Sequence, residues 1–265
     1  MENGRRYKTA RPEEGVCRAR AILDLELFTE PSDRDVLRVH QLMGRSAMDY
    51  DTDTGPVFCR VCGLGETRPF PAAGILYHRC RHCAATFMAT AFLPSPEAER
   101  NRYEQHRNDP DDPGYRRFLY RTAGPLLHRL WPECRGLDFG CGPVSAMARI
   151  MEANGHFMDV YDPFFAPDET VLERTYDFIT CTEVAEHFHC PEAEFERLGG
   201  LLNPGGYLAV MTCFQTDDEK FANWHYRRDF THVVFYREET FGVLARQRGW
   251  ELEIPEKDVV LLRRP

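Results

Sequence analysis

A turn that carries two glycines between an apolar strand and a helix constrains this chain most. Residues 136–142 read Gly-Leu-Asp-Phe-Gly-Cys-Gly, and a helix is expected directly after them, up to about Asn154. The next strand, over residues 156–162, ends in an acidic residue. Glycines let a backbone approach a ligand closely, and open α/β sheets bind ligands beyond the carboxyl ends of their strands. The stretch therefore predicts a site for a nucleotide-type cofactor.

Strands and helices alternate through the rest of the chain, which predicts a mostly parallel α/β sheet of Rossmann-like type. We expect strands over 176–183, 206–214, 250–254 and 258–264, and helices over 191–202 and 237–248. A chain of 265 residues with 43% hydrophobic content can bury one such core and keep a small satellite module. The expected division is a tail with a short helix near 33–48 (1–50), a small module (51–94), a helical bridge or lid (95–131) and a cofactor-binding domain (132–265).

Two matched cysteine pairs lie in the small module. Cys59 and Cys62 form one C-x-x-C pair, Cys80 and Cys83 form the other, and 17 residues separate them. This spacing is typical of zinc ribbons, in which four thiolates close a tetrahedral site with no open position. We therefore expect a structural zinc ion. The nearby histidines His78 and His82 are the alternative ligands.

The acidic residue of the second strand bears on which cofactor is bound. Asp162 follows Asp138 by 24 residues, at the place where a carboxylate can accept hydrogen bonds from ribose hydroxyls. A nicotinamide or flavin dehydrogenase would need a third glycine in the pattern G-x-G-x-x-G, but position 145 is Ser. The pattern Asp-Phe-Gly-Cys-Gly-Pro instead resembles the first motif of class I S-adenosylmethionine-dependent methyltransferases.

Later motifs agree with that family in order and spacing. The segment YDFITCTE followed by VAEHF is similar to its fourth strand, and NPGG followed by GYLAVMT is similar to its fifth. Residues 224–241, and the zinc-ribbon prefix, resemble a bacterial subgroup of these enzymes. The resemblance implies a methyltransferase that uses S-adenosylmethionine. It implies cofactor contacts at Asp138, Phe139, Gly140, Cys141, Gly142, Asp162, Pro163, Phe164, Thr182 and Glu183.

The chain departs from the family after Asp162. Only 13 residues separate it from Tyr176, too few for the usual helix, third strand and second helix. We expect the third strand to be reduced or missing. Phe164 and Phe165 are then the candidates for an apolar clamp on the adenine.

Methyl transfer requires alignment of the acceptor with the methyl group and, for some acceptors, removal of a proton. His187 and His232 are the candidate general bases, since histidine titrates near neutrality. The alternative is that they only orient loops or cofactor.

The acceptor is expected to be a small molecule, because a net charge of −9 disfavours a nucleic acid. One alternative is an RNA or protein acceptor read by the four ribbon arginines, Arg60, Arg68, Arg79 and Arg81. The other is a non-catalytic zinc-stabilised binding protein. No apolar run reaches the roughly 18 residues of a membrane helix, and the N-terminus lacks a secretory pattern, so a cytoplasmic protein is expected. The oligomeric state and the acceptor itself are not specified.

Overall fold

The computed structural model describes residues 57–105 and 108–265. All of them belong to one compact unit, residues 46–265. Among these residues, no helix combines the length and the apolar character that a membrane span requires. The helix expected near 33–48 lies outside the described residues.

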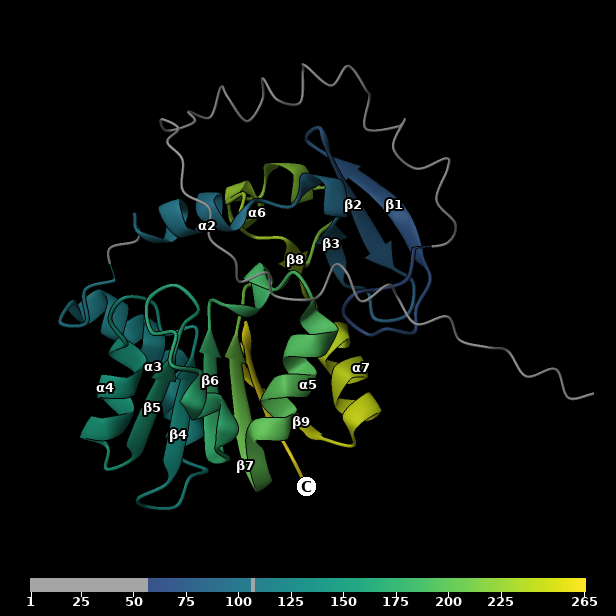
Figure 1. The fold of residues 1–265 in the computed structure, drawn as a ribbon. Helices are drawn as coiled ribbons and strands as arrows, with labels where there is room; N and C mark the ends of the chain where they lie inside the picture. The colour runs from purple at the N-terminus through teal and green to yellow at the C-terminus, as the bar shows by residue number, and fades with distance from the viewer. Residues whose placement is uncertain (1–56, 106–107) are drawn as a thin grey trace, which may run out of the picture. The chain divides into compact units, whose positions relative to one another are not determined.

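The larger sheet has six strands in the order β5-β4-β6-β7-β10-β9 (Figure 1). Its strands are β4 (Arg135–Phe139), β5 (Phe157–Tyr161), β6 (Tyr176–Thr182), β7 (Leu202–Met211), β9 (Glu251–Glu256) and β10 (Val259–Arg263). The first four in spatial order are parallel, and β10 runs antiparallel to both of its neighbours, β7 and β9. The predicted Rossmann-like, mostly parallel sheet is confirmed.

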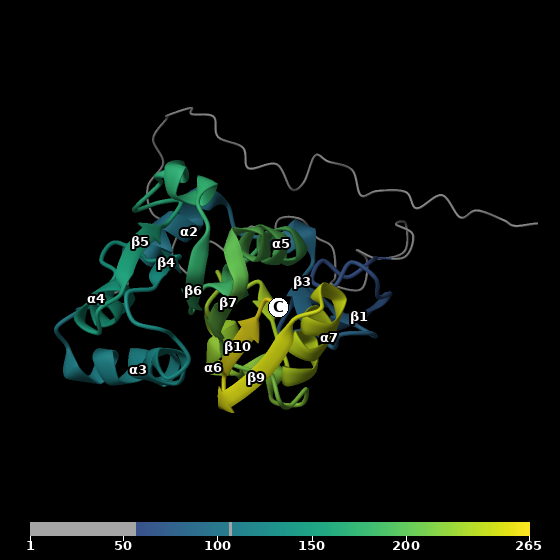
Figure 2. The same ribbon diagram turned by 90° about the horizontal axis from the view of Figure 1, so that it is seen from below.

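Helices cover both faces of this sheet (Figure 2). α3 (Pro113–Leu127) and α4 (Ala146–Ala153) lie on one face, and α5 (Pro191–Leu201) and α7 (Glu238–Arg248) lie on the other. Successive side chains of a strand point to opposite faces, so in β6 Phe178 belongs to the core under α3 and α4. Its neighbour Ile179 belongs to the larger core on the other side.

The sheet ends at β5 because the chain holds no further strand there. Between β5 and β6 the described residues form only the short helix η2 (Glu169–Glu173) and an isolated bridge between Asp162 and Ala166. The prediction of a reduced or missing third strand is confirmed. The 13 intervening residues suffice to return the chain to the sheet but not to add a strand and its covering helices.

The cysteine-bearing segment builds a second sheet of four strands, in the order β1-β2-β3-β8. They are β1 (Thr67–Ala72), β2 (Ile75–Cys80), β3 (Thr86–Met88) and β8 (Val234–Phe235). Phe87 pairs with Val234, so the last strand comes from the C-terminal half of the chain. The four cysteines share one apolar core with residues of α5 and α7 such as Phe195 and Phe241. The sequence did not predict this joining strand, and the domain boundaries at 94 and 131 stay predictions.

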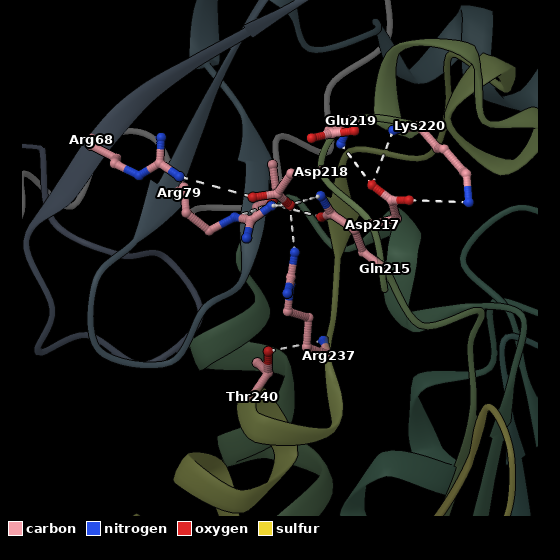
Figure 3. A network of polar contacts seen from close by, with 10 residues as sticks. Arg68, Arg79, Gln215, Asp217, Asp218, Glu219, Lys220, Arg237 and Thr240 are labelled. Carbon is pink, nitrogen blue, oxygen red and sulfur yellow. Dashed lines mark hydrogen bonds and ion pairs between the residues drawn. The ribbon is translucent and has the colours of Figure 1, made fainter.

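A polar network fastens the second sheet to the loop after β7 (Figure 3). Arg79 of β2 donates to Asp218 at 2.6 Å, and Arg68 of β1 lies 3.9 Å from the same carboxylate. Arg237, directly before α7, is its third ion-pair partner. Gln215 also donates to Asp218, at 3.1 Å. One carboxylate thus joins three arginines from distant parts of the sequence.

Candidate functional site

The glycine turn leads from β4 into α4. Gly140 and Gly142 both adopt positive φ, +80° and +64°, which other residues rarely do. A Cβ on Gly140 would collide with the side chain of Val184, whereas nothing lies within 4 Å of the Cβ position of Gly142. The backbone N–H of Gly140 donates to Tyr161 O at 2.8 Å, which ties the turn to β5. The second glycine therefore offers bare backbone to a ligand.

Asp138 anchors this turn from below. Its carboxylate is buried and accepts hydrogen bonds from Thr180 Oγ1 (2.7 Å) and Ser145 Oγ (2.6 Å). Burial raises the pKa of Asp138, and these two hydrogen bonds oppose that rise. Ser145 also caps α4 by accepting from Ala148 N. Sequence reasoning missed Ser145 and Thr180; an N-capping serine at the helix start was the available signal.

Asp162 closes the loop at the end of β5. One carboxylate oxygen accepts from the backbone N–H of Gly142 at 3.0 Å. The other accepts from Phe164 N at 2.9 Å and Phe165 N at 3.1 Å. The carboxylate is 8% exposed and joins the two loops that border the carboxyl end of β4. Pro163, which lies between Asp162 and Phe164 in the sequence, is exposed.

The remaining predicted contacts of the turn are inside or beside it. Phe139 is buried and stacks on Tyr161, with ring centroids 5.3 Å apart. Burial, and then the charges of Asp138 and Asp162, raise the pKa of the Cys141 thiol to about 12. Cys141 is therefore a neutral thiol in the physiological range rather than a nucleophile.

A row of rings runs from this loop to the two predicted bases. Phe164 lies 5.7 Å from Tyr103 of α2 (Pro96–Tyr103), and Tyr103 lies 5.1 Å from His187, between ring centroids. His187 and His232 follow at 4.8 Å, with planes at 76°. The structure thus brings together residues that the sequence separates by up to 129 positions (103 to 232). The sequence did not predict Tyr103 as the link.

Each of these histidines has its Nδ1 bound to a backbone carbonyl. His187 Nδ1 lies 2.9 Å from Thr231 O, and His232 Nδ1 lies 2.7 Å from Tyr226 O. A carbonyl only accepts, so Nδ1 carries the hydrogen and donates in both rings, and Nε2 keeps its lone pair in the neutral form. Burial lowers the pKa of His232, which favours that neutral form. Both rings are therefore fixed with an acceptor atom available.

Three side chains at the end of β6 and just after it complete this edge of the sheet. The hydroxyl of Thr182 is buried and has no hydrogen-bond partner. Glu183 has a positive φ of 53°, and burial, followed by the charge of Glu186, raises its pKa to about 9. Glu186 is fully buried, accepts from Thr212 Oγ1 at 2.9 Å, and has a second oxygen without a partner. Glu186 was not among the individually predicted cofactor contacts or bases; its place between a strand end and a histidine was the available signal.

The four cysteines form one buried cluster, and the thiols are free. Cys59 and Cys83 lie 3.7 Å apart, as do Cys62 and Cys80, between Sγ atoms. A tetrahedral zinc ion with Zn–S bonds of about 2.3 Å would separate its ligands by about 3.8 Å. Backbone N–H groups donate to the sulfurs of Cys59 and Cys80, at 3.3 Å each. The donor set and spacing fit zinc, and His78 and His82 are not in the cluster.

The cluster is tied directly to α7. Thr240 Oγ1 donates to Cys83 O at 2.8 Å, and Gln247 Nε2 donates to Cys62 O at 2.8 Å. Gly65 lies so close to the cluster that a Cβ there would approach the sulfur of Cys80 and the side chain of His82. The cluster therefore fixes the second sheet against the larger one.

The profile of a family described as "Methyltransferase domain" matches residues 115–253. No curated protein sequence matches the chain significantly. Solved structures are similar at low identity. An O-methyltransferase family protein from Burkholderia thailandensis shares 13% identity at a TM-score of 0.41, over 65% of this chain and 62% of that chain. The N-methyltransferase NodS from Bradyrhizobium japonicum shares 17% at 0.39, over 58% and 98%.

A third similar structure is the 1,6-didemethyltoxoflavin-N1-methyltransferase of Burkholderia thailandensis, with its substrate and S-adenosylhomocysteine bound. It shares 18% identity at a TM-score of 0.45, over 68% of this chain and 95% of that chain. At such identities and TM-scores these structures do not define an acceptor for this chain.

Proposed function

We propose that this chain, which belongs to the family of S-adenosylmethionine-dependent methyltransferases, transfers a methyl group to a small-molecule acceptor by in-line displacement. The observation that carries the proposal is the pair His187 and His232, held with both Nε2 lone pairs available at the end of a ring row that begins beside the glycine turn. A bound S-adenosylmethionine supplies an electrophilic methyl group on a sulfonium.

The glycine turn and the end of β5 are the proposed cofactor cradle. Gly142 leaves backbone uncovered, and Thr182 has a buried hydroxyl without a partner, so both can serve a ligand. Asp162 holds the two loops in register and retains lone pairs for ribose hydroxyls. Phe164 and Phe165 are the proposed adenine clamp. Asp138 is proposed to position the glycine turn through the hydrogen bond that it accepts from Ser145.

The two histidines are proposed to face the acceptor. Either Nε2 can accept a proton from an acceptor hydroxyl or amine, and the fixed Nδ1 hydrogen bonds hold the rings still while it does so. Tyr103 covers the same site from α2, which Arg102 holds by two hydrogen bonds to Asp229, at 2.9 and 2.7 Å. These contacts hold Tyr103 against the ring of His187.

The ribbon arginines support a small acceptor over RNA. Arg60 donates to His189 O at 3.2 Å and to Met88 O, and Arg79 is bound to Asp218. Arg68 also lies near Asp218, at 3.9 Å. Most of the arginines that an RNA-binding ribbon would need therefore already contact other groups of the protein.

We also propose that the four cysteines hold a structural zinc ion. Four thiolates leave no position for a substrate, so the ion stabilises the second sheet and takes no part in methyl transfer. This proposal depends on the sulfur spacing and the N–H groups that donate to the sulfurs.

Calorimetry tests the cofactor site. Wild-type protein is expected to bind S-adenosylmethionine, and Gly142→Ala, which adds a methyl group where the backbone is bare, is expected to bind more weakly while staying folded. Gly155→Ala is the matched control, since Gly155 also has a positive φ and open space but lies beyond α4. Equal affinity in both variants would place the cofactor elsewhere.

Labelled methyl transfer tests the acceptor class. Protein and isotope-labelled S-adenosylmethionine are incubated with a cell extract separated into small molecules, RNA and protein. We expect label in the small-molecule fraction, lost in His187→Gln and His232→Gln. Label in RNA or protein alone would contradict a small acceptor.

A further inference from the structure

Glu186 is a buried carboxylate that the protein only half satisfies. Its exposed fraction is 0%, Oε2 accepts from Thr212 Oγ1 at 2.9 Å, and Oε1 has no hydrogen-bond partner. A buried carboxylate oxygen without a donor or a cation is costly, so one is expected to be supplied. Within the described part of the chain, no Lys or Arg forms an ion pair with this group.

The two proposed bases surround that oxygen. One ligand atom each from Glu186, His187 and His232 lie within 4.8 Å of one another. His187 Nε2 is 3.9 Å from Glu186 Oε1. In both rings Nδ1 donates to a backbone carbonyl. The remaining ring nitrogen, Nε2, carries a lone pair in the neutral form and is therefore an acceptor. With both rings neutral, three acceptors face one another, and a positive charge between them, either a proton on His187 Nε2 or a metal ion, relieves their repulsion.

The outer contacts of this cluster are those of a metal site. A ligating histidine characteristically donates its other N–H to a carbonyl or carboxylate, and a ligating carboxylate is itself hydrogen-bonded. Here His187 donates to Thr231 O and His232 donates to Tyr226 O. The carboxylate of Glu186 accepts from Thr212 Oγ1. Thus each candidate ligand is oriented by one further group.

We infer that Glu186, His187 and His232 bind a divalent first-row transition ion. Two imidazoles and one carboxylate suit zinc, iron(II) or cobalt(II), whereas magnesium and calcium prefer oxygen ligands. Metal–nitrogen and metal–oxygen bonds of about 2.0–2.2 Å would place the ligand atoms about 3–3.5 Å apart. The ligand atoms, now within 4.8 Å of one another, would therefore move together by about an ångström when the ion binds. The side chain of His187 remains 15% exposed, which gives the ion a way in.

Three protein ligands leave positions for an acceptor, unlike the closed cysteine site. The catalytic use of the ion rests on the proposed function. A bound ion would occupy the Nε2 lone pairs, so the histidines would hold the ion instead of accepting a proton themselves, and the ion would lower the pKa of the acceptor's hydroxyl or amine. The site itself does not depend on the acceptor. The ligand class that fits is an acceptor with an ionisable hydroxyl or amine.

Cobalt(II) is the probe. The full chain is first loaded with a single equivalent of zinc, which the four thiolates take up, and elemental analysis checks that each chain carries one zinc ion. Cobalt(II) is then titrated by calorimetry and visible absorption. We expect one further cobalt ion to bind, with affinity reduced by more than about tenfold in Glu186→Gln and His232→Gln. Thr212→Val keeps all three ligands but loses the hydroxyl that bonds to Glu186 and to Tyr226, and it is expected to bind about 10–100-fold more weakly. His225→Gln, which changes an exposed histidine, is expected to bind as wild type does.

Thermal unfolding supplies a second readout. Cobalt(II) is expected to raise the Tm of wild type but not that of Glu186→Gln, and metal-free Glu186→Gln is expected to be at least as stable as wild type because it removes an uncompensated buried charge. No cobalt binding by folded, zinc-loaded wild type, or equal binding by all variants, would overturn the inference. Calorimetry with S-adenosylmethionine is run on the same samples, so a failed metal site and a failed methyltransferase assignment give different results.

Discussion

Thr180 Oγ1 donates a 2.7 Å hydrogen bond to Asp138 Oδ1 between the two adjacent strands β6 and β4. Both side chains are buried, so Thr180→Val would leave one carboxylate oxygen without a donor at nearly unchanged volume. We expect a loss of about 1–3 kcal/mol in the free energy of unfolding, and a further rise in the pKa of Asp138, whose carboxylate this bond stabilises. Denaturant unfolding measures the loss.

The matched control is Thr170→Val, which removes an exposed hydroxyl bonded to Asp168 at 2.7 Å. Its effect is expected to stay within about 0.5 kcal/mol, as for most surface changes. Equal losses in the two variants would show that Thr180 does not support the carboxylate.

The sheet could be predicted because its evidence is local. Hydrophobic runs bounded by turn residues define β4 to β7, and the short link after Asp162 is visible by counting residues. The cysteine cluster could be predicted equally well, because C-x-x-C pairs indicate both the type of metal ligand and the spacing of the ligands. These features need no knowledge of what folds against them.

The joining strand and the ring row depend on long-range packing. β8 has only two residues, and its strand character comes from pairing with β3, about 150 positions earlier in the chain. Tyr103 meets Phe164 and His187 because α2 is held by long-range contacts, to Asp229 through Arg102 and to His189 through Glu99. Glu186 is adjacent to a predicted base, but its burial and its unpartnered oxygen have no signature in sequence. The roles of the predicted site residues stay predictions.

His156 is expected to make the protein sensitive to acid. It is buried beside Phe178, its Nδ1 has no partner, and burial lowers its pKa. The folded state then binds the proton less tightly than the unfolded chain, whose histidine pKa is about 6.5. Stability is complete above about pH 6.5 and falls as pH decreases through the lowered folded pKa.

This acid sensitivity is checked by thermal unfolding between about pH 7.5 and about pH 5, a range that brackets the ordinary histidine pKa. The Tm of His156→Phe is expected to fall less over this range than that of wild type. His128→Gln, at the exposed end of α3, should keep the wild-type slope. An unchanged slope in His156→Phe would assign the acid sensitivity to other groups.

Cys83→Ser is expected to lower zinc content and loosen the second sheet. Serine is a poor zinc ligand, and loss of the ion removes the closure of a segment joined to α7 through Cys83 O and Cys62 O. Elemental analysis should show less zinc per chain, and limited proteolysis should cut near β1 and β2. Cys134→Ser, outside the cluster, is the control. A Cys83→Ser protein with full zinc would contradict the four-cysteine site.

The network in Figure 3 predicts different effects for two neighbouring aspartates. Asp218 is paired with Arg68, Arg79 and Arg237, and Arg79 is only 6% exposed, so Asp218→Asn leaves a nearly buried guanidinium without its counter-charge. Breaking a fully buried pair costs about 3–5 kcal/mol, and the partial exposure of Asp218 reduces the expected loss to about 1–2 kcal/mol.

Asp217→Asn is the control, because among the described residues Asp217 forms an ion pair with Lys220 alone, an exposed group 3.1 Å away. Its loss is expected to be much smaller than that of Asp218→Asn, because exposed ion pairs contribute little to stability. Denaturant unfolding at low and high salt separates the two: the Asp218→Asn loss should persist at high salt, since Arg79 is screened little, whereas any Asp217→Asn loss should vanish. If both variants unfold as wild type does, the arginines do not depend on Asp218. The shared apolar core, the pairing of β8 with β3, and the hydrogen bonds that Cys62 O and Cys83 O accept from α7 then suffice to hold the second sheet.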